Sequence, residues 1–394
     1  MTQRILELAA EIQPRLVEIR RDIHAHPELG LEEERTSAIV ADTLEALGLE
    51  VRRNFYATGV VGLLRGAKPG KTLLLRADMD ALPVREETGL PYKSLCDGKM
   101  HACGHDAHTT WLLGTAMILS RLRDQLCGNV KFMFQPAEEN PGGANEMIHE
   151  GLLQNPDVDF AMGAHVNPTL PAGKYLIEDG PVTSNPDFFR ITLVGKGSHG
   201  SAPQDGIDAI AMGVKVYNLL ETFVSRLSDP CEPVVLSVCK MTGGTTRGAI
   251  AERCVLEGTV RSFRQEIRQQ AKDFIDASCR AVTGLYGGTY DFYYEAKSFS
   301  VMNDPAIAAQ ARRAAADIVG EENVLAKDRK FMGGEDYCFI ARAVPSAFLF
   351  VGCANPDAFE SMPLHSARFQ LDERVLGNTA AVFSQAALQL LAEP

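Results

Sequence analysis

Three short apolar runs in the first half of the chain each end in residues that can bind metal ions. "KTLLLRADMD" ends in Asp78 and Asp80, "NVKFMFQPAEE" ends in Glu138 and Glu139, and "DFAMGAHV" ends at His165 and its neighbour. Apolar runs of this length, separated by helical patterns, predict buried strands of a parallel sheet that is covered by helices. Because ligands sit at the carboxyl ends of such strands, we expect these side chains to converge on one crevice.

The stretch "MHACGHDAHTTW", residues 100–111, lies between the first two runs. It is expected to open a helix, because Trp111, Leu112, Thr115 and Leu119 recur at helical spacing. A later apolar run, "SAFLFVGC", is followed by a loop with "MPLHSARF". Imidazole, thiolate and carboxylate are the groups that hold transition metals in proteins. Five of the nine histidines fall in these loops: His101, His105, His108, His165 and His365.

The middle of the chain has a different pattern. Alternating runs such as "FFRITLVGKG", "VVLSVCKMTGG" and "CVLEGTVRSF" frame two helical patterns, near residues 209–226 and 267–286. The order strand, helix, strand, strand, helix, strand predicts a small α+β domain with an antiparallel sheet. Site histidines lie on both sides of this segment, so it is expected to be an insertion in a larger domain.

A chain of 394 residues exceeds what one hydrophobic core usually organises. We therefore predict an α/β protein of two domains. The first, residues 1–184 and 298–394, is a metal-binding catalytic domain with helices around a mostly parallel sheet. The second, residues 185–297, is the inserted α+β domain.

Composition limits the classes of partner. The formal net charge of -12 argues against nucleic acid or an anionic membrane as the main partner. The N-terminal stretch spaces its apolar residues helically and has no secretory-signal pattern, and we expect no membrane-spanning run. The cysteines, nine in number and without framework spacing, indicate reduced thiols and a cytoplasmic location.

These side chains are sufficient for a hydrolytic metal centre, which needs three to five ligands, an open position for water and a base beside that water. A thiolate placed between two cations can bridge them. Glu138 and Glu139 are adjacent in an extended loop, so one can bind metal while the other faces the water. The candidate ligands are Cys103, His105, Glu139, His165 and His365.

Each residue also has a simpler interpretation. Cys103 would alone be a buried thiol, or a nucleophile paired with His105 or His108. His108, one helical turn after His105, is more typical of a hydrogen-bonding partner than of a ligand. Asp80 either caps a turn or orients a ligand. His24 is expected to be structural, closing the first helix.

Seven motifs occur in an order that resembles a known family: "LLLRADMDALP", "MHACGHDAHT", "FQPAEE", "GAHV", "GKGSHGSAP", "MGGEDY" and "LHSARF". The chain resembles the hippurate hydrolase and auxin-conjugate hydrolase branch of the metal-dependent aminoacylase and carboxypeptidase family. This resemblance implies a di-zinc-peptidase-like catalytic domain. It also implies an inserted, ferredoxin-like lid domain through which the subunits form a homodimer or homotetramer.

The resemblance assigns roles by motif. Two divalent metal ions, Mn, Zn, Ni or Co, would be held by Cys103, His105, Glu139, His165 and His365. Glu138 would be the general base, and Asp80 would orient a metal-binding histidine. His199 of "GSHGSAP" would stabilise the oxyanion, in relatives often from the partner subunit. The loop "GGTTRGAIAERC" departs from the pattern, because relatives commonly have asparagine where Gly248 stands.

The expected reaction is hydrolysis of an N-acyl amino acid, hippurate-like or N-acetyl, with a metal-activated water. The substrate is small, and no cofactor other than metal is implied. A metallo-dipeptidase, a thiol enzyme built on Cys103 and a non-catalytic metal-binding homologue are the alternatives.

Overall fold

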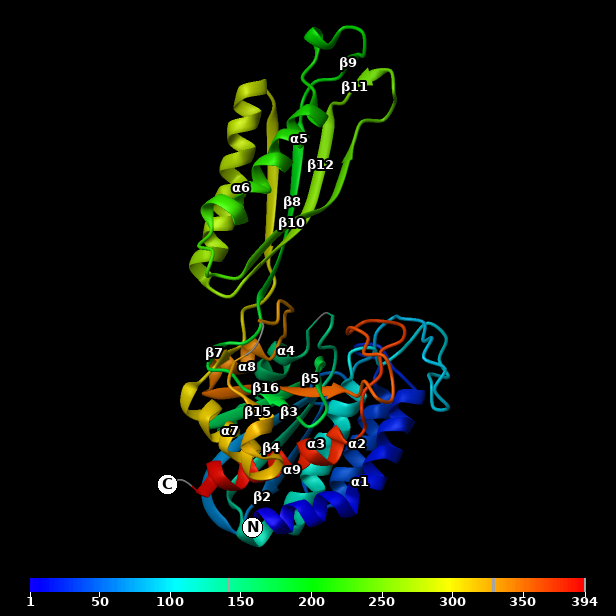
Figure 1. Cartoon of the computed structure of the whole chain (residues 1–394), viewed down its shortest axis with the longest axis vertical. Coiled ribbons are helices and arrows are strands. Elements are labelled where there is room, and N and C mark those ends of the chain that lie inside the picture. Colours follow the sequence, from blue (N-terminus) through cyan, green and yellow to red (C-terminus); the bar gives the residue numbers. More distant parts are fainter. Residues whose placement is uncertain (141, 328–329, 393–394) are drawn as a thin grey trace. The chain divides into compact units, whose positions relative to one another are not determined.

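The computed structural model describes residues 1–140, 142–327 and 330–392, and the chain folds into two compact units (Figure 1). Unit 1 comprises Met1–Gly180, Val301–Arg329 and Asp336–Pro394. Unit 2 comprises Pro181–Ser300 and Lys330–Glu335. Positions 328–329 and 393–394 of the expected segment 298–394 lie outside the described residues.

Unit 1 is built on an eight-stranded sheet whose central strands β4, β3, β5 and β16 are parallel. Strands β1 and β2 add to one edge in antiparallel fashion, and β6 and β15 extend the other. In spatial order the strands are β1 (Glu50–Arg52), β2 (Val60–Arg65), β4 (Cys127–Gln135), β3 (Lys68–Asp78), β5 (Phe160–Pro171), β16 (Ser346–Ala354), β6 (Tyr175–Leu176) and β15 (Val324–Leu325).

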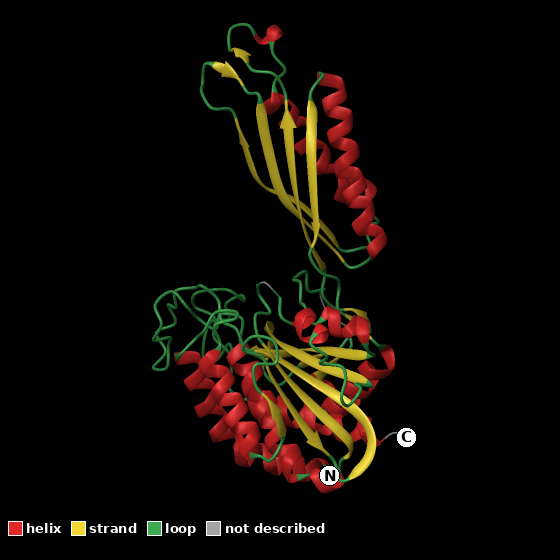
Figure 2. Ribbon diagram, turned by 180° about the vertical axis from the view of Figure 1, so that it is seen from behind, coloured by secondary structure: helices red, strands yellow, loops and turns green. Residues whose placement is uncertain are grey.

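Helices cover both faces of this sheet (Figure 2). Five long helices share one apolar core with alternate residues of β3, namely Leu73, Leu75 and Ala77. They are α1 (Thr2–Ala25), α2 (Glu34–Ala46), α3 (His105–Arg121), α7 (Pro305–Val319) and α9 (Val375–Ala392). The short helices on the other face are α4 (Ala144–His149) and α8 (Cys338–Ala343), and single turns are η1 (Arg123–Gln125) and η4 (Glu321–Asn323).

Helix α9 is long and apolar enough to cross a membrane by length and composition, which the sequence analysis did not anticipate. However, 78% of its residues are buried inside the protein. It packs in the core of unit 1, against α1, α3 and α7. A helix buried in this way is a core helix of a globular domain.

Unit 2 has its own sheet and its own core. Its four antiparallel strands have the spatial order β10, β12, β8 and β13, and α5 and α6 pack on one face. Burial alternates along β12, as expected for a strand with one covered face. The elements are β8 (Asn185–Val194), β9 (Ser198–His199), η2 (Pro203–Asp205), α5 (Ala209–Leu220), η3 (Phe223–Leu227), β10 (Val234–Gly243), β11 (Ala249–Ile250), β12 (Arg253–Ser262), α6 (Gln265–Tyr286) and β13 (Thr289–Ala296).

The predicted fold class is confirmed, with a mostly parallel central sheet in unit 1 and a strand, helix, strand, strand, helix, strand order in unit 2. Two very short strands, β7 (Gly180–Pro181) and β14 (Met302–Asn303), pair where the chain passes between the units.

Three segments group with unit 2 although the sequence analysis placed them in the larger domain: residues 181–184, 298–300 and 330–335. The Ser184 side chain donates to the carbonyl of Met332 over 2.6 Å, and Lys330 Nζ donates to the carbonyl of Pro181 over 2.9 Å. Nothing in the local hydrophobic pattern of "KFMGGE" signals these contacts, because they are made by backbone carbonyls and one lysine.

A buried ion pair in unit 2 gives the first prediction. Arg268 Nε donates to Asp187 over 2.6 Å, and Nη2 also bonds the carbonyl of Ser298 over 2.7 Å. Arg268→Met leaves the buried Asp187 carboxylate without its cation, so we expect a loss of about 3–5 kcal/mol in unfolding free energy. Urea unfolding followed by circular dichroism measures it.

The control is Arg190→Met on β8, whose side chain is 58% exposed beside Glu257. We expect that variant to lose less than about 1 kcal/mol. Equal urea midpoints for the two variants would contradict the assignment of Arg268 as the main polar anchor of unit 2.

Candidate metal centre

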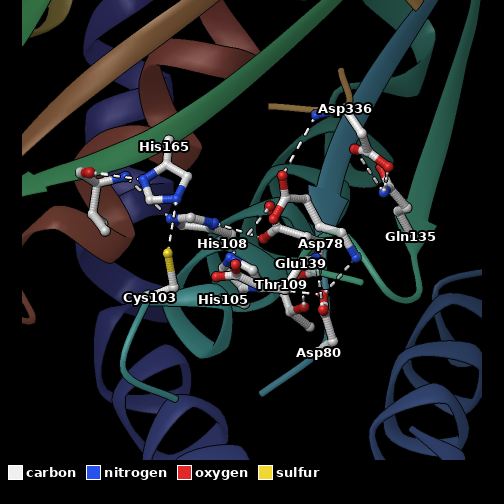
Figure 3. Close-up of polar contacts among 12 residues, drawn as sticks. Asp78, Asp80, Cys103, His105, His108, Thr109, Gln135, Glu139, His165 and Asp336 are labelled. Carbon is white, nitrogen blue, oxygen red and sulfur yellow. Dashed lines mark hydrogen bonds and ion pairs between the residues drawn. The ribbon is translucent and has the colours of Figure 1, made fainter. Parts of the chain in front are cut away.

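The ends of β3 and β4, the start of α3 and the middle of β5 bring candidate residues of unit 1 together (Figure 3). Strand β5 continues beyond His165 to Pro171, whereas the sequence analysis expected that run to end at His165. Asp78, the last residue of β3, pairs with Gln135, the last residue of β4. On the other side, Arg76 pairs with Gly163 of β5, so His165, two residues further, is level with Asp78. Strand register therefore places acids and imidazoles along one edge of the sheet.

Asp80 connects two of the predicted loops. Its buried carboxylate accepts hydrogen bonds from the backbone N–H groups of Glu138 and Glu139, both at 3.0 Å. The same carboxylate lies 3.2 Å from Nδ1 of His105. One side chain thus fixes both the loop after β4 and the imidazole at the start of α3, which favours the orienting role over a simple turn cap.

The first turn of α3 begins after Gly104, which has a left-handed backbone with φ of +84°. A Cβ at this position would lie 2.6 Å from Val166 Cγ2, so only glycine fits. The turn directs His105 and His108 toward the strand ends.

His108 uses both of its ring nitrogens in hydrogen bonds. Nδ1 lies 2.6 Å from Asp78 Oδ1, and Nε2 accepts the backbone N–H of Val166 over 3.1 Å. Burial lowers the pKa of His108 to about 3, although Asp78 acts in the opposite direction. His108 is therefore a neutral partner of Asp78 with no nitrogen left for a metal.

His105 differs from His108, because its buried Nε2 has no hydrogen-bond partner among the residues that the structure describes. The Cys103 sulfur and His165 Nε2 lie 3.3 Å apart, and His165 Nδ1 lies 2.8 Å from the carbonyl of Val166. Figure 3 shows the sulfur directed at the His165 ring. The ligand atoms of Cys103, His105 and His165 all lie within 4.8 Å of one another.

A second group contains the same sulfur. The ligand atoms of Cys103, Glu139 and His365 also lie within 4.8 Å of one another, and His365 Nε2 is 3.0 Å from Glu139 Oε1. The backbone N–H of His365 donates to the carbonyl of Ala102 over 2.9 Å, which joins the two loops. His165 is buried, whereas the His365 side chain is 52% exposed.

The charge of the site suits cations. Burial lowers the pKa of His105, but Asp78, Asp80 and Glu139 raise it to about 10. Burial raises the pKa of Cys103, and the carboxylates of Glu139 and Glu138 raise it further. His105 Nε2 lies 3.8 Å from Asp78 Oδ2 and has no hydrogen bond among the described residues. This nitrogen, the surplus of negative charge and the mixed sulfur, nitrogen and oxygen donors fit divalent transition metals.

The same electrostatics argue against Cys103 as a nucleophile. Reactive cysteines lie in electropositive, partly exposed surroundings that lower the thiol pKa. Cys103 is buried among carboxylates, and its pKa is raised. A metal pair, rather than an imidazole, is the partner that would convert this thiol to a thiolate.

His199 is in unit 2 and is not a member of these groups. It lies on β9, is exposed, and its Nδ1 contacts Ser201 Oγ at 2.7 Å. Its neighbour Gly200 donates to the carbonyl of Gly248 over 2.8 Å. A Cβ at Gly248 would meet no atom within 4 Å, so the side chain that relatives carry there would project into open space.

Two supporting acids were missed by the sequence analysis. Asp336 accepts hydrogen bonds from Gln135 Nε2 and from the backbone of Ala144, on either side of the Glu138 loop. Glu33 accepts the backbone N–H of Ala137, a residue with φ of +54°. Burial raises the pKa of Glu33. Asp336 lies in "MGGEDY", one of the seven motifs that carry the resemblance, and this was a signal for it, whereas Glu33 lies in none of them.

Comparison with known proteins decides the family. The family model described as Peptidase family M20/M25/M40 matches residues 74–389. The chain belongs to the M20 peptidase family. The predicted resemblance to metal-dependent aminoacylases and carboxypeptidases is thereby confirmed, and this M20 protein is a metal-dependent hydrolase of amide bonds.

Individual M20 relatives match along most of the chain. Thermostable carboxypeptidase 1 of Saccharolobus solfataricus is 37% identical over 370 residues, 93% of each chain. N-acyl-L-amino acid amidohydrolase of Geobacillus stearothermophilus is 42% identical over 295 residues, 74% of this chain and 79% of its own. The crystal structure of a dinuclear metal-binding M20 peptidase from Bacillus subtilis has a TM-score of 0.85 at 32% identity and covers 97% of this chain and 99% of its own.

The role of Asp80 can be tested by Asp80→Asn. The amide group would present N–H to a backbone N–H or to the ring of His105, so one hydrogen bond becomes a repulsive contact. We expect a loss of about 1–3 kcal/mol in stability and about 10–100-fold weaker metal binding. Calorimetric titration of the metal-free protein with Zn²⁺ measures the second effect.

Asp124→Asn, at an exposed position in η1, is the control and should leave both quantities unchanged. Unaltered zinc affinity in Asp80→Asn would contradict the orienting role.

Proposed function

We propose that this M20 protein hydrolyses the amide bond of N-acyl amino acids, with two divalent metal ions and Glu138 as general base. The observation that carries the proposal is the convergence of the other four predicted donors on the Cys103 sulfur, with the Glu138 loop held beside them by Asp80. The relative named N-acyl-L-amino acid amidohydrolase supports the substrate class.

The ligand assignment follows the two groups. Cys103 belongs to both groups, so it would help to hold both metal ions. His105 and His165 would complete the buried position, and Glu139 and His365 would complete the more exposed one. This donor set accepts Mn, Zn, Ni or Co, because it mixes a soft thiolate with imidazoles and a hard carboxylate.

When bound, the cations would polarise the amide carbonyl and lower the pKa of a water molecule at the site. Glu138 takes a proton from this water as the water oxygen bonds to the amide carbon. Glu138 then gives the proton to the amide nitrogen as the C–N bond breaks, and a carboxylate and a free amino acid leave. Burial raises the pKa of Glu139, but His365 and His105 outweigh it and lower the pKa to about 2, so Glu139 stays ionised as a ligand.

The variant Glu138→Gln tests the proposal. The amide cannot accept a proton, so we expect turnover of hippurate and N-acetyl amino acids to fall by about 10²–10⁴-fold. Metal content should remain at two ions per chain, because Glu138 is not assigned as a ligand. Amine release across a panel of acyl amino acids and dipeptides, with Mn, Zn, Co or Ni supplied, measures the activity.

The control is Glu150→Gln, at an exposed position after α4. Near wild-type turnover in Glu138→Gln would exclude the general-base role. Cleavage of dipeptides alone would favour the dipeptidase, and the absence of cleavage with every metal would favour a non-catalytic homologue.

We also propose that unit 2 joins two subunits. Helix α5 buries Met212 and Val216 on its own sheet, yet Ile210, Val214 and Tyr217 are exposed at helical spacing on its other side. A hollow of about 240 Å³ beside the edge strand β10 is lined by Val214, Tyr217, Val238, Cys239, Lys240 and Met241. An exposed apolar stripe next to an unpaired strand edge is typical of an interface.

In such a dimer, His199 of each chain would stabilise the oxyanion in the partner's site. Val214→Glu places a charge in the apolar stripe, so we expect a shift from dimer to monomer and, with it, loss of turnover. Analytical ultracentrifugation and the amine-release assay measure the two effects. Leu285→Glu, on α6 at a side chain that is 83% exposed, is the control.

A Val214→Glu monomer with full turnover would contradict the assignment of His199 across the interface. Unchanged sedimentation would contradict the interface itself.

A cytoplasmic location is part of the proposal. All nine cysteines lie in the described ranges and none forms a disulfide. Five of them are buried and two are partly buried, which is typical of thiols in a reducing compartment.

A further inference from the structure

Two basic residues near the end of α1 are buried among apolar neighbours. Arg20 is 1% exposed and His24 is fully buried, on the helix face that also carries Leu16 and Ile23. The sequence analysis gave His24 only the role of closing the helix. A buried guanidinium is costly unless every donor is paired, so the partners of Arg20 define what this face does.

Arg20 and His24 bind the same carboxylate, that of Asp106. Arg20 Nε donates to Asp106 Oδ2 over 2.7 Å, and His24 Nδ1 lies 2.7 Å from the same oxygen. The other nitrogen of His24 lies 3.3 Å from Glu86 Oε1. Arg20 Nη2 also lies 3.3 Å from His24 Nδ1, so the ring is held between one guanidinium and two carboxylates.

Asp106 is the residue after His105 in the first turn of α3. Its other oxygen accepts the backbone N–H of Ala107 over 2.9 Å. The turn is therefore held from two sides: His105 contacts Asp80, and Asp106 contacts α1. These contacts set the direction of the His105 ring.

The same basic face also reaches the loop of His365. Arg20 Nη1 lies 3.4 Å from Glu373 Oε1, and Arg21 binds the same carboxylate at 2.6 Å. Next to Glu86, the partner of His24, the backbone N–H of Glu87 donates to the carbonyl of Ala367 over 2.8 Å. The end of α1 thus contacts the segment after His365 directly at Glu373, and the Glu86–Glu87 segment that His24 contacts is bonded to Ala367 in the same loop.

We propose that Arg20 and His24 form a positioning platform that sets the distance between the Cys103–His105 loop and the His365 loop. The inference rests on the proposed function, because it assigns these loops to the two metal ions. The platform acts through Asp106, Glu86 and Glu373 and touches neither metal nor substrate.

Directional bonds explain why charged groups suit this place. Replacing a buried ion pair with apolar side chains often leaves stability unchanged or raises it. An apolar contact does not fix orientation, whereas charge-assisted hydrogen bonds to one carboxylate do. Outer partners of this kind typically change metal affinity by about 10–100-fold when removed.

The test is cobalt binding to metal-free protein, measured well below the unfolding temperature. Asp106→Asn and Arg20→Lys keep size or charge but lose the shared bonds. We expect both to bind Co²⁺ about 10–100-fold more weakly than the wild type, with altered d–d bands in the visible spectrum. Arg15→Met, on the same helix at an exposed pair with Glu18, is the control and should match the wild type.

A purely structural role makes a different prediction. In that case the variants would unfold at lower temperature, but the folded protein would keep wild-type cobalt affinity and spectrum, and the platform would be excluded. Two variants are used so that a failure of one to fold, seen by circular dichroism, leaves the other. A wild type that binds no cobalt would contradict the proposed function, whereas unchanged variants would contradict only the platform.

Discussion

The carboxylate of Asp80 is the contact on which the metal centre depends. It binds the backbone of Glu138 and Glu139 and contacts the ring of His105, so it joins loops that follow β4 and precede α3. Without this contact, the positions of His105 and of the two glutamates would not be fixed relative to one another. Because Asp80 binds the backbone N–H groups of the two glutamates, it does not occupy their carboxylates.

Around this contact, buried negative charge accumulates at one edge of the sheet. The Arg76 guanidinium balances part of it through Asp78, and the neutral His108 ring is hydrogen-bonded to the same carboxylate. The remainder raises the pKa of His105 and of Cys103, which is the state expected of a ligand set that requires cations. The same carboxylates therefore attract cations to the site and repel one another when no cation is bound.

Much of this arrangement could be predicted from the sequence. Strand ends, helical spacing and donor residue types were sufficient to bring Cys103, Glu139, His165 and His365 together, because parallel strands deliver their loops to one edge. Features that depend on long-range pairing could not be predicted. Arg20 finds Asp106 across 86 positions, and a buried arginine on an apolar helix face has no local signature.

The grouping of residues 330–335 was also not predictable, for a related reason. Its contacts are to backbone carbonyls and to the Ser184 hydroxyl, which any sequence of similar size could make. A hydrophobic pattern predicts which side chains are buried. It does not predict a hydrogen bond that is accepted by a backbone carbonyl, because every residue has one.

That grouping has a consequence for exchanging parts between relatives. Unit 2 is not one continuous stretch, because the chain returns to it for six residues after a passage through unit 1. A chimaera that receives only residues 181–300 would pack them against the host's own segment in place of residues 330–335. To move the whole of unit 2 into a relative, both of its stretches, the long one and the short one, must be exchanged together. Recombination between relatives has to keep the same two stretches together.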